Sequence, residues 1–145
     1  MSPQDVPDGP LLVDTDVISY WVLHDKGQEF SRLVAGHELA VSFASYGELL
    51  AIAYQSRWGV RRIQSLRDRL RSLVVVPYNV EIVERWAKMH AKLSGHLHKG
   101  GTNDLWTAAC AVAMHPQLPV VTNNLGDFRT IAASFPELRV VHPDI

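Results

Sequence analysis

Four acidic residues, far apart in the chain, stand at places where their carboxylates can meet. Asp14, Glu48 and Asp127 each follow a short apolar run typical of a buried strand, and Asp104 follows a glycine-rich stretch typical of a helix start. Anionic groups brought close together repel one another and raise one another's pKa values unless a cation lies among them. Carboxylate oxygens suit hard divalent ions rather than Zn²⁺. The set therefore predicts a site for Mg²⁺ or Mn²⁺.

Each of these acids also has an ordinary alternative role. Asp14 could be a turn residue, Asp104 could stabilise a helix N-terminus, and Glu48 and Asp127 could be solvated charges. Taken singly, the ordinary role is favoured for every one of them. The metal site is favoured because all four are expected at the same end of one sheet.

Short apolar runs, separated by segments long enough for helices, indicate the elements that position these acids. In the intervening segments apolar residues recur at three- and four-residue steps, as helices require. The helical sets are Leu49, Ile52 and Ala53; Ile63, Leu66 and Leu70; Val83, Trp86, Ala87 and His90; and Leu105, Ala108, Ala109 and Val112. The expected strands are Leu11–Val13, Leu39–Phe43, Leu73–Val76, Pro119–Val121 and a weaker, edge-like run at Arg139–Val141.

Alternation of strands and helices predicts an α/β fold. Each crossover must return across the sheet, so the strands are expected to be parallel, with helices on both faces. Ligands in such sheets gather outside the carboxyl ends of the strands. The residues directly after each apolar run, among them Asn123 and Asn124, are therefore the ones that can do chemistry.

Length and composition indicate one domain over residues 1–145, with residues 1–9 as a loose N-terminal arm. The chain has 145 residues, of which 47% are hydrophobic, enough for a single sizeable core. Its longest apolar run, Ala108–Met114, is far too short to cross a membrane, and the N-terminus lacks the features of a secretory signal. A single cysteine, Cys110, cannot form an internal disulfide. We therefore expect a cytoplasmic protein.

Charge is unevenly distributed, although the net charge is only −1. Between Arg57 and Lys99 ten basic residues face three acidic ones, a balance of +7, and the rest of the chain carries −8. Such segregation suits a basic face that attracts polyanions beside an acidic region that holds metal. From charge alone, two amphipathic helices with solvated arginines are the more favoured interpretation.

Four segments together resemble the successive motifs of PIN-domain ribonucleases, specifically the VapC toxins of bacterial type II toxin–antitoxin systems. Each motif is weak alone, but four in this order and spacing, between Leu11 and His142, are quite specific. The segments are Leu11–Ser19, Ser45–Leu50, Asn103–Ala109 and Val121–Phe128.

The resemblance implies a three-layer α/β/α sandwich with a mostly parallel sheet of four to five strands. It also implies an acidic pocket that binds Mg²⁺ or Mn²⁺ and cleaves RNA. Asp14, Glu48 and Asp104 match the three most regular acidic positions. The fourth position is open between Asp127, which we favour as a metal ligand, and Asn124 as a neutral or water-mediated one.

Other residues match the family less directly. Thr15 and Thr122 resemble hydroxyl residues that orient the pocket, and Asp16 stands where the family often has asparagine. The family often has a glycine a few residues after the glutamate, which Ala51–Ala53 lacks. The partners implied are an RNA substrate (tRNA, rRNA or mRNA), a VapB-type antitoxin and a second copy of the chain. The antitoxin is expected to bind in an exposed apolar groove between the segment Ala44–Trp58 and the arginine-bearing helix that follows it.

Basic residues of the +7 segment are expected to bind the RNA backbone. His96 and His98 could instead be transition-metal ligands, but no cysteine or acidic residue accompanies them in the sequence, and we favour phosphate contact. The predicted RNA-binding residues are Arg57, Arg61, Arg62, Lys92, His96, His98 and Lys99.

Two rival interpretations remain. Leu11–Val17 also resembles the Asp-x-Asp motif of haloacid dehalogenase-type phosphatases, in which Asp14 would be a covalent nucleophile and Asp16 a general acid. The chain is short for that class, and the residue four after Asp127 is Ile131 where an acid is expected. The second rival is a PIN-like module that binds without catalysis. It would be marked by loss of a site acid, and all four are present.

Overall fold

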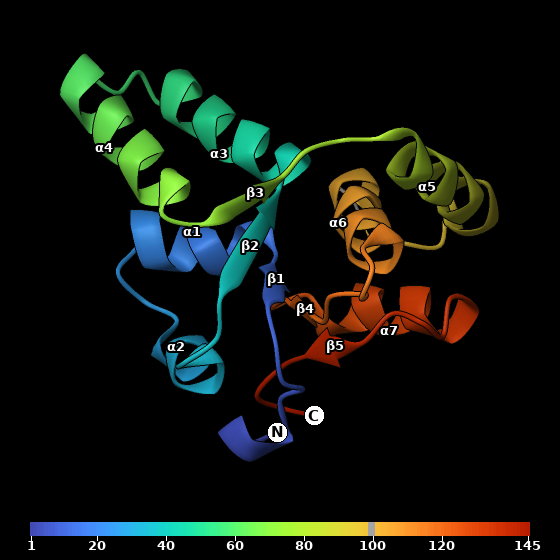
Figure 1. Ribbon diagram of the computed structural model, residues 1–145. Coiled ribbons are helices and arrows are strands. Elements are labelled where there is room, and N and C mark those ends of the chain that lie inside the picture. The colour runs from blue at the N-terminus through green and yellow to red at the C-terminus, as the bar shows by residue number, and fades with distance from the viewer. Residues whose placement is uncertain (99–100) are drawn as a thin grey trace.

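Five short parallel strands form the sheet at the centre of the molecule (Figure 1). The computed structural model describes residues 1–98 and 101–145. All five predicted strand runs are confirmed, and the weak fifth run is an edge strand, as expected. The strands lie in the order β3-β2-β1-β4-β5, with the bounds β1 (Leu11–Val13), β2 (Leu39–Ser42), β3 (Val74–Val76), β4 (Val120–Val121) and β5 (Val140–Val141).

Helices cover both faces of this sheet, which confirms the three-layer α/β/α sandwich. Leu11 and Val13 of β1 pack with the first four helices, whereas Leu12 between them packs with the last three, because successive strand residues point to opposite faces. Figure 1 shows the two groups on either side of the sheet. The helices are α1 (Thr15–Leu23), α2 (Gln28–Val34), α3 (Phe43–Gln55), α4 (Val60–Arg71), α5 (Val80–Leu93), α6 (Gly101–Ala113) and α7 (Leu125–Ser134).

The helices α3 to α6 were expected, but the buried face of α5 differs from the prediction. Val83 is 42% exposed and Ala87 is also exposed. Ile82, Met89 and Leu93 form the buried stripe instead. The predicted and the observed stripes are offset by one residue. Because α5 has apolar residues on both stripes, their spacing alone could not show which stripe is buried.

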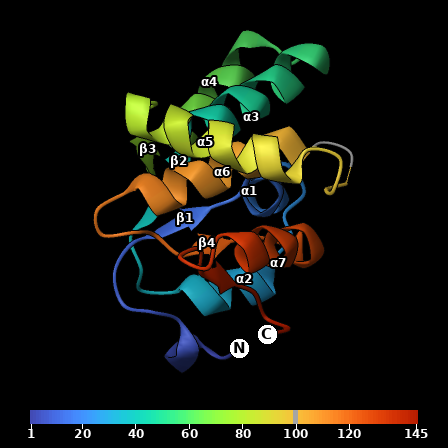
Figure 2. The ribbon, with the colours of Figure 1, turned by 90° about the vertical axis from the view of Figure 1, so that its right-hand side faces the viewer.

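The first nine residues lie against the C-terminal end of the chain rather than extending as an arm. They contain a short 3₁₀ turn, Pro3–Asp5, after which Val6 is buried in the core. The Met1 ammonium donates to the carbonyl oxygen of Pro143 at 3.0 Å. Both views place the N- and C-termini side by side (Figure 2). In the part of the chain that the structure describes, no helix is long and apolar enough to cross a membrane.

Candidate active site

A cavity of about 310 Å³ opens at the carboxyl ends of the central strands. It joins residues that follow β1, residues of α3, the first turn of α6 and the residue that precedes α7. Three of the four predicted acids, Asp14, Glu48 and Asp104, therefore share one cavity, whereas Asp127 does not line it. The lining residues are Asp14, Thr15, Asp16, Ser19, Glu48, Ile52, Asn103, Asp104 and Asn124.

Asp14 is held at the base of this cavity. It is the N-cap of α1, and its Oδ1 accepts the Thr15 backbone N–H at 2.8 Å. Its Oδ2 accepts the Thr122 hydroxyl at 2.8 Å, and the Thr107 hydroxyl lies 3.4 Å from Oδ1. Asp14 is only 3% exposed, and burial, with the charges of Asp16 and Glu48, raises its pKa to about 7. Thr122 was predicted to orient the pocket, and its hydrogen bond to Asp14 agrees with that role. The contact of Thr107 with Asp14 was not predicted from the sequence.

Glu48 reaches the cavity from the second turn of α3. Its Oε2 accepts a hydrogen bond from Asn103 Nδ2 at 2.7 Å and lies 3.4 Å from the Thr15 hydroxyl. That hydroxyl is also 2.8 Å from Ser45 Oγ. Burial raises the pKa of Glu48. Asn103, directly before Asp104, thus orients a neighbouring acid, a role that its place in the sequence motif did not indicate.

Asp16, in the first turn of α1, connects this helix to the loop that follows β4. Its Oδ1 accepts the Val17 N–H at 2.7 Å, and its Oδ2 accepts the Asn123 N–H at 3.1 Å. Burial raises its pKa to about 6 even though these hydrogen bonds lower it. Asp16 therefore both holds the backbone at this edge and adds negative charge to the cavity wall.

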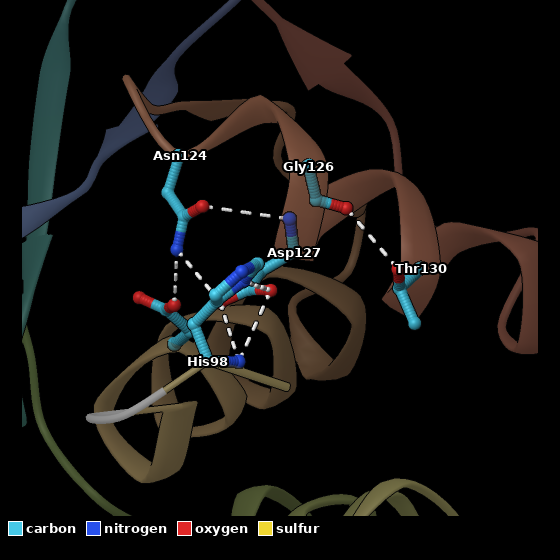
Figure 3. Close-up of polar contacts among 6 residues, drawn as sticks. His98, Asn124, Gly126, Asp127 and Thr130 are labelled. Atoms are coloured by element: carbon cyan, nitrogen blue, oxygen red, sulfur yellow. Dashed lines mark hydrogen bonds and ion pairs between the residues drawn. The ribbon is translucent and has the colours of Figure 1, made fainter. Parts of the chain in front are cut away.

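Asn124 binds two carboxylates at once (Figure 3). Its Nδ2 donates to Asp104 Oδ2 at 2.8 Å and to Asp127 Oδ2 at 3.0 Å. Its own side-chain oxygen caps α7, which begins at Leu125. Gly126 and Asp127 therefore both lie inside the first turn of this helix.

Asp127 lies behind Asn124, in the first turn of α7, and is 3% exposed. Its Oδ1 is 2.8 Å from His98 Nδ1, and the His98 backbone N–H donates to both carboxylate oxygens at 3.2 and 3.3 Å. Burial alone would raise the pKa of Asp127, but the hydrogen bonds from His98 and Asn124 outweigh it and lower the pKa. His98 thus has an acidic partner, which its neighbours in the sequence did not indicate.

The acids at the cavity fit a hard divalent cation. Burial, and then the charge of Asp14, raises the pKa of Asp104 to about 7, so the charged forms of the two residues oppose each other. A cation among them would remove that opposition. Among the described side chains, no three His, Cys, Asp or Glu residues are already arranged as metal ligands. The oxygen-only donor set matches Mg²⁺ or Mn²⁺.

The predicted RNA-binding residues are divided among separate places. Arg57, Arg61 and Arg62 lie at the turn between α3 and α4, where the Arg62 guanidinium stacks 3.7 Å from the centre of the Trp58 ring. Lys92 and His96 line a different cavity of about 380 Å³ beside α7. His98 contacts Asp127, and Lys99 lies outside the described residues.

Comparison with known proteins decides the family. The family model for the PIN domain matches residues 11–133, which is most of the chain. The chain belongs to the PIN-domain family. Residues of this PIN domain are 29% identical over 126 positions to Ribonuclease VapC1 of Haemophilus influenzae strain R2866, covering 83% of this chain and 90% of that protein.

Solved structures agree with this PIN fold. VapBC-1 from nontypeable Haemophilus influenzae superimposes with a TM-score of 0.72 at 22% identity, over 94% of this chain and 99% of that one. VapBC2 from Rickettsia felis, bound to a DNA fragment from its promoter, gives 0.73 at 20% identity, over 91% and 97%. The family match overturns the phosphatase alternative. The geometry agrees, since both Asp14 oxygens accept hydrogen bonds and Asp16 accepts two backbone N–H groups.

Proposed function

We propose that this PIN domain is a metal-dependent endoribonuclease of the VapC type. The observation that carries the proposal is the convergence of Asp14, Glu48 and Asp104 on one cavity at the carboxyl ends of the strands. Burial and the charges of neighbouring acids raise the pKa values of Asp14 and Asp104 to about 7, which is the electrostatic signature of a site that takes a cation.

The ligands proposed for Mg²⁺ or Mn²⁺ are these three carboxylates. The bound ion would activate water and offset the negative charge that develops on a scissile phosphate. Thr122 and the Thr15 N–H favour the charged form of Asp14. Asn103 orients Glu48, and Asn124 orients Asp104. Asp127 is proposed to act through Asn124 rather than as a direct ligand.

Incubation of the purified protein with labelled RNA tests the proposal. We expect shorter RNA products with Mg²⁺ or Mn²⁺ and intact RNA with a chelator, and sequencing of the new ends would give the cleavage site. Intact RNA under every metal condition would support a module that binds without catalysis. Free phosphate released from small phosphoesters would restore the phosphatase interpretation.

A double-mutant cycle is expected to separate the two candidates for the fourth position. Asp127 uses both of its oxygens, and asparagine offers only one acceptor, so Asp127→Asn must weaken the contact to Asn124 or the one to His98. Asn124→Ala and Asp127→Asn should each raise the Kd for Mg²⁺ about tenfold. If Asp127 acts through Asn124, the double variant should bind no more weakly than Asn124→Ala alone. Additive effects, measured by calorimetry, would make Asp127 an independent ligand.

Basic side chains outside the cavity are proposed to bind RNA phosphates. Lys92→Gln with His96→Gln should weaken RNA binding and flatten its salt dependence, by about 0.7 in the slope of log K against log salt for each single-strand phosphate that is no longer neutralised. Exposed Arg32, on α2 outside the basic segment, provides the matched control Arg32→Gln. An unchanged slope in the double variant would make these residues ordinary solvated charges. The triple change at Arg57, Arg61 and Arg62 tests the α3–α4 turn in the same assay.

We also propose an antitoxin and a second copy of the chain as partners. Solved structures with the same fold include complexes named VapBC. A hollow between α1 and the end of α4 would receive an apolar segment of an antitoxin. It is lined mostly by apolar residues, Ile18, Trp21, Val22, Leu70 and Leu73, together with Arg69 and Ser72. None of its lining residues lies in Ala44–Trp58, so this hollow differs from the groove expected from the sequence. Exposed apolar residues on β3 and the start of α5 offer a face for a second copy: Val74, Val75, Tyr78, Val80 and Val83.

A further inference from the structure

His98 joins the α5–α6 connection to the first turn of α7 by two kinds of contact. Its backbone N–H donates to the Asp127 carboxylate at 3.2 and 3.3 Å, and its ring Nδ1 lies 2.8 Å from Asp127 Oδ1. Figure 3 shows His98, Asp127 and Asn124 side by side. The Asp127 carboxylate already accepts from the His98 N–H and from Asn124, and an ionised carboxylate can only accept, so the Nδ1 atom carries the hydrogen.

The contact continues from His98 to an acid in the cavity. Asp127 accepts from His98 on Oδ1 and from Asn124 on Oδ2, so one carboxylate holds both groups without competition. The same Asn124 Nδ2 donates to Asp104. Asp104 stands in the first turn of α6. The four residues thus form a continuous series of contacts from His98 to an acid of the cavity.

We propose that His98 is a positioning residue, which fixes Asp127 and Asn124 so that Asp104 is set to bind a divalent ion. The inference rests on the proposed function for the identity of the ion. It assigns the role to the Nδ1 hydrogen of the ring. His98 therefore acts through Asp127, in the way that partners behind a ligand tune metal affinity in other proteins.

The other available role of His98 uses a different atom. The side chain is 87% exposed, so Nε2 is free to meet an RNA phosphate, as predicted from the sequence. Two substitutions separate these roles because each keeps one nitrogen. Asparagine places an N–H near the position of Nδ1, and glutamine places one near the position of Nε2. His98→Ala keeps only the backbone N–H.

The experiment is calorimetric titration of Mn²⁺ into the full chain without RNA, for the native protein and the variants His98→Asn, His98→Gln and His98→Ala. We expect His98→Asn to bind like the native protein, and the other two to bind about tenfold more weakly. Melting temperatures should stay close to the native value, since the altered ring is largely exposed. At low Mn²⁺ concentration, His98→Asn should cleave RNA like the native protein, and His98→Gln and His98→Ala should cleave it more slowly.

Other outcomes would overturn the inference. Native affinity in all three variants would show that the ring does not position Asp104. If His98→Asn lost Mn²⁺ affinity and His98→Gln retained it, the role would belong to Nε2. A second readout in the metal-free protein, the NMR signals of the Asn124 side-chain amide, should shift in His98→Ala but not in His98→Asn. If the native protein binds no Mn²⁺, the proposed metal dependence fails, and these amide signals still decide whether His98 positions Asn124.

Discussion

Replacement of Asp14 or Asp104 by asparagine is expected to abolish RNA cleavage while making the metal-free protein more stable. The two side chains line one cavity. Burial, with the charges of Asp16 and Glu48, raises the pKa of Asp14, and burial, with the charge of Asp14, raises the pKa of Asp104. Asparagine keeps the shape but removes a ligand charge, so the charge stabilisation of the reaction is lost. If the transition state loses about 4 kcal/mol or more of stabilisation, the cleavage rate falls by at least about 10³-fold. Removal of one charge also relieves repulsion in the folded state.

Cleavage assays with excess Mg²⁺ and thermal unfolding with a chelator measure the two effects. Glu48→Gln should lose activity in the same way, because Glu48 lines the same cavity. Asp8→Asn, at an exposed position outside the site, is the matched control and should change neither quantity. Native activity in purified Asp14→Asn or Asp104→Asn would rule out these residues as ligands.

Stability of the metal-free protein is expected to fall as the pH rises from about 4 to about 7. The pKa of Asp14 rises from 3.8 to about 7 on folding, and that of Asp104 does the same. Between these values the folded protein holds protons that the unfolded chain has lost, so a rise in pH favours unfolding. The loss should be on the order of a few kcal/mol in total. Divalent ions should restore most of it, and more at pH 8 than at pH 5.

Urea unfolding across this pH range, with Mn²⁺ or with a chelator, measures the effect. Asp104→Asn should flatten the pH dependence, because the variant lacks one of the two titrating groups. If the metal-free protein were equally stable at pH 5 and pH 8, folding would not raise the pKa values of the acids in the cavity. A cation site at this cavity would then lack electrostatic support.

Features that depend on one strand or one helix start could be predicted from the sequence. Asp14 follows the apolar run Leu11–Val13, which is typical of a buried strand, and a strand of a parallel sheet brings its last residue to the ligand-binding edge. Gly101 and the alanines after Asp104 marked a helix whose first turn holds that acid, as observed. These assignments could be made because they depend only on residues that are close together in the sequence.

Features that depend on which side chains meet across the fold could not be predicted. Spacing left both Asn124 and Asp127 open as the fourth residue, and only the start of α7 at Leu125 places Asn124 at the cavity. The contact of His98 with Asp127 joins residues 29 positions apart, which no spacing rule covers. In α5, apolar residues on two neighbouring stripes left the buried face undetermined until α6 was in place.

The place of β1 in the middle of the sheet has a consequence for synthesis of the protein. Asp14 leaves the ribosome early, but Thr122, which donates to it, is 108 positions later in the chain. β1 pairs with β2 first and must wait for β4, at Val120–Val121, to gain its second neighbour. The acidic cavity therefore stays incomplete until the segment with β4 and Thr122 has left the ribosome. A nascent chain is expected to gain the proposed nuclease site only after that segment has been made.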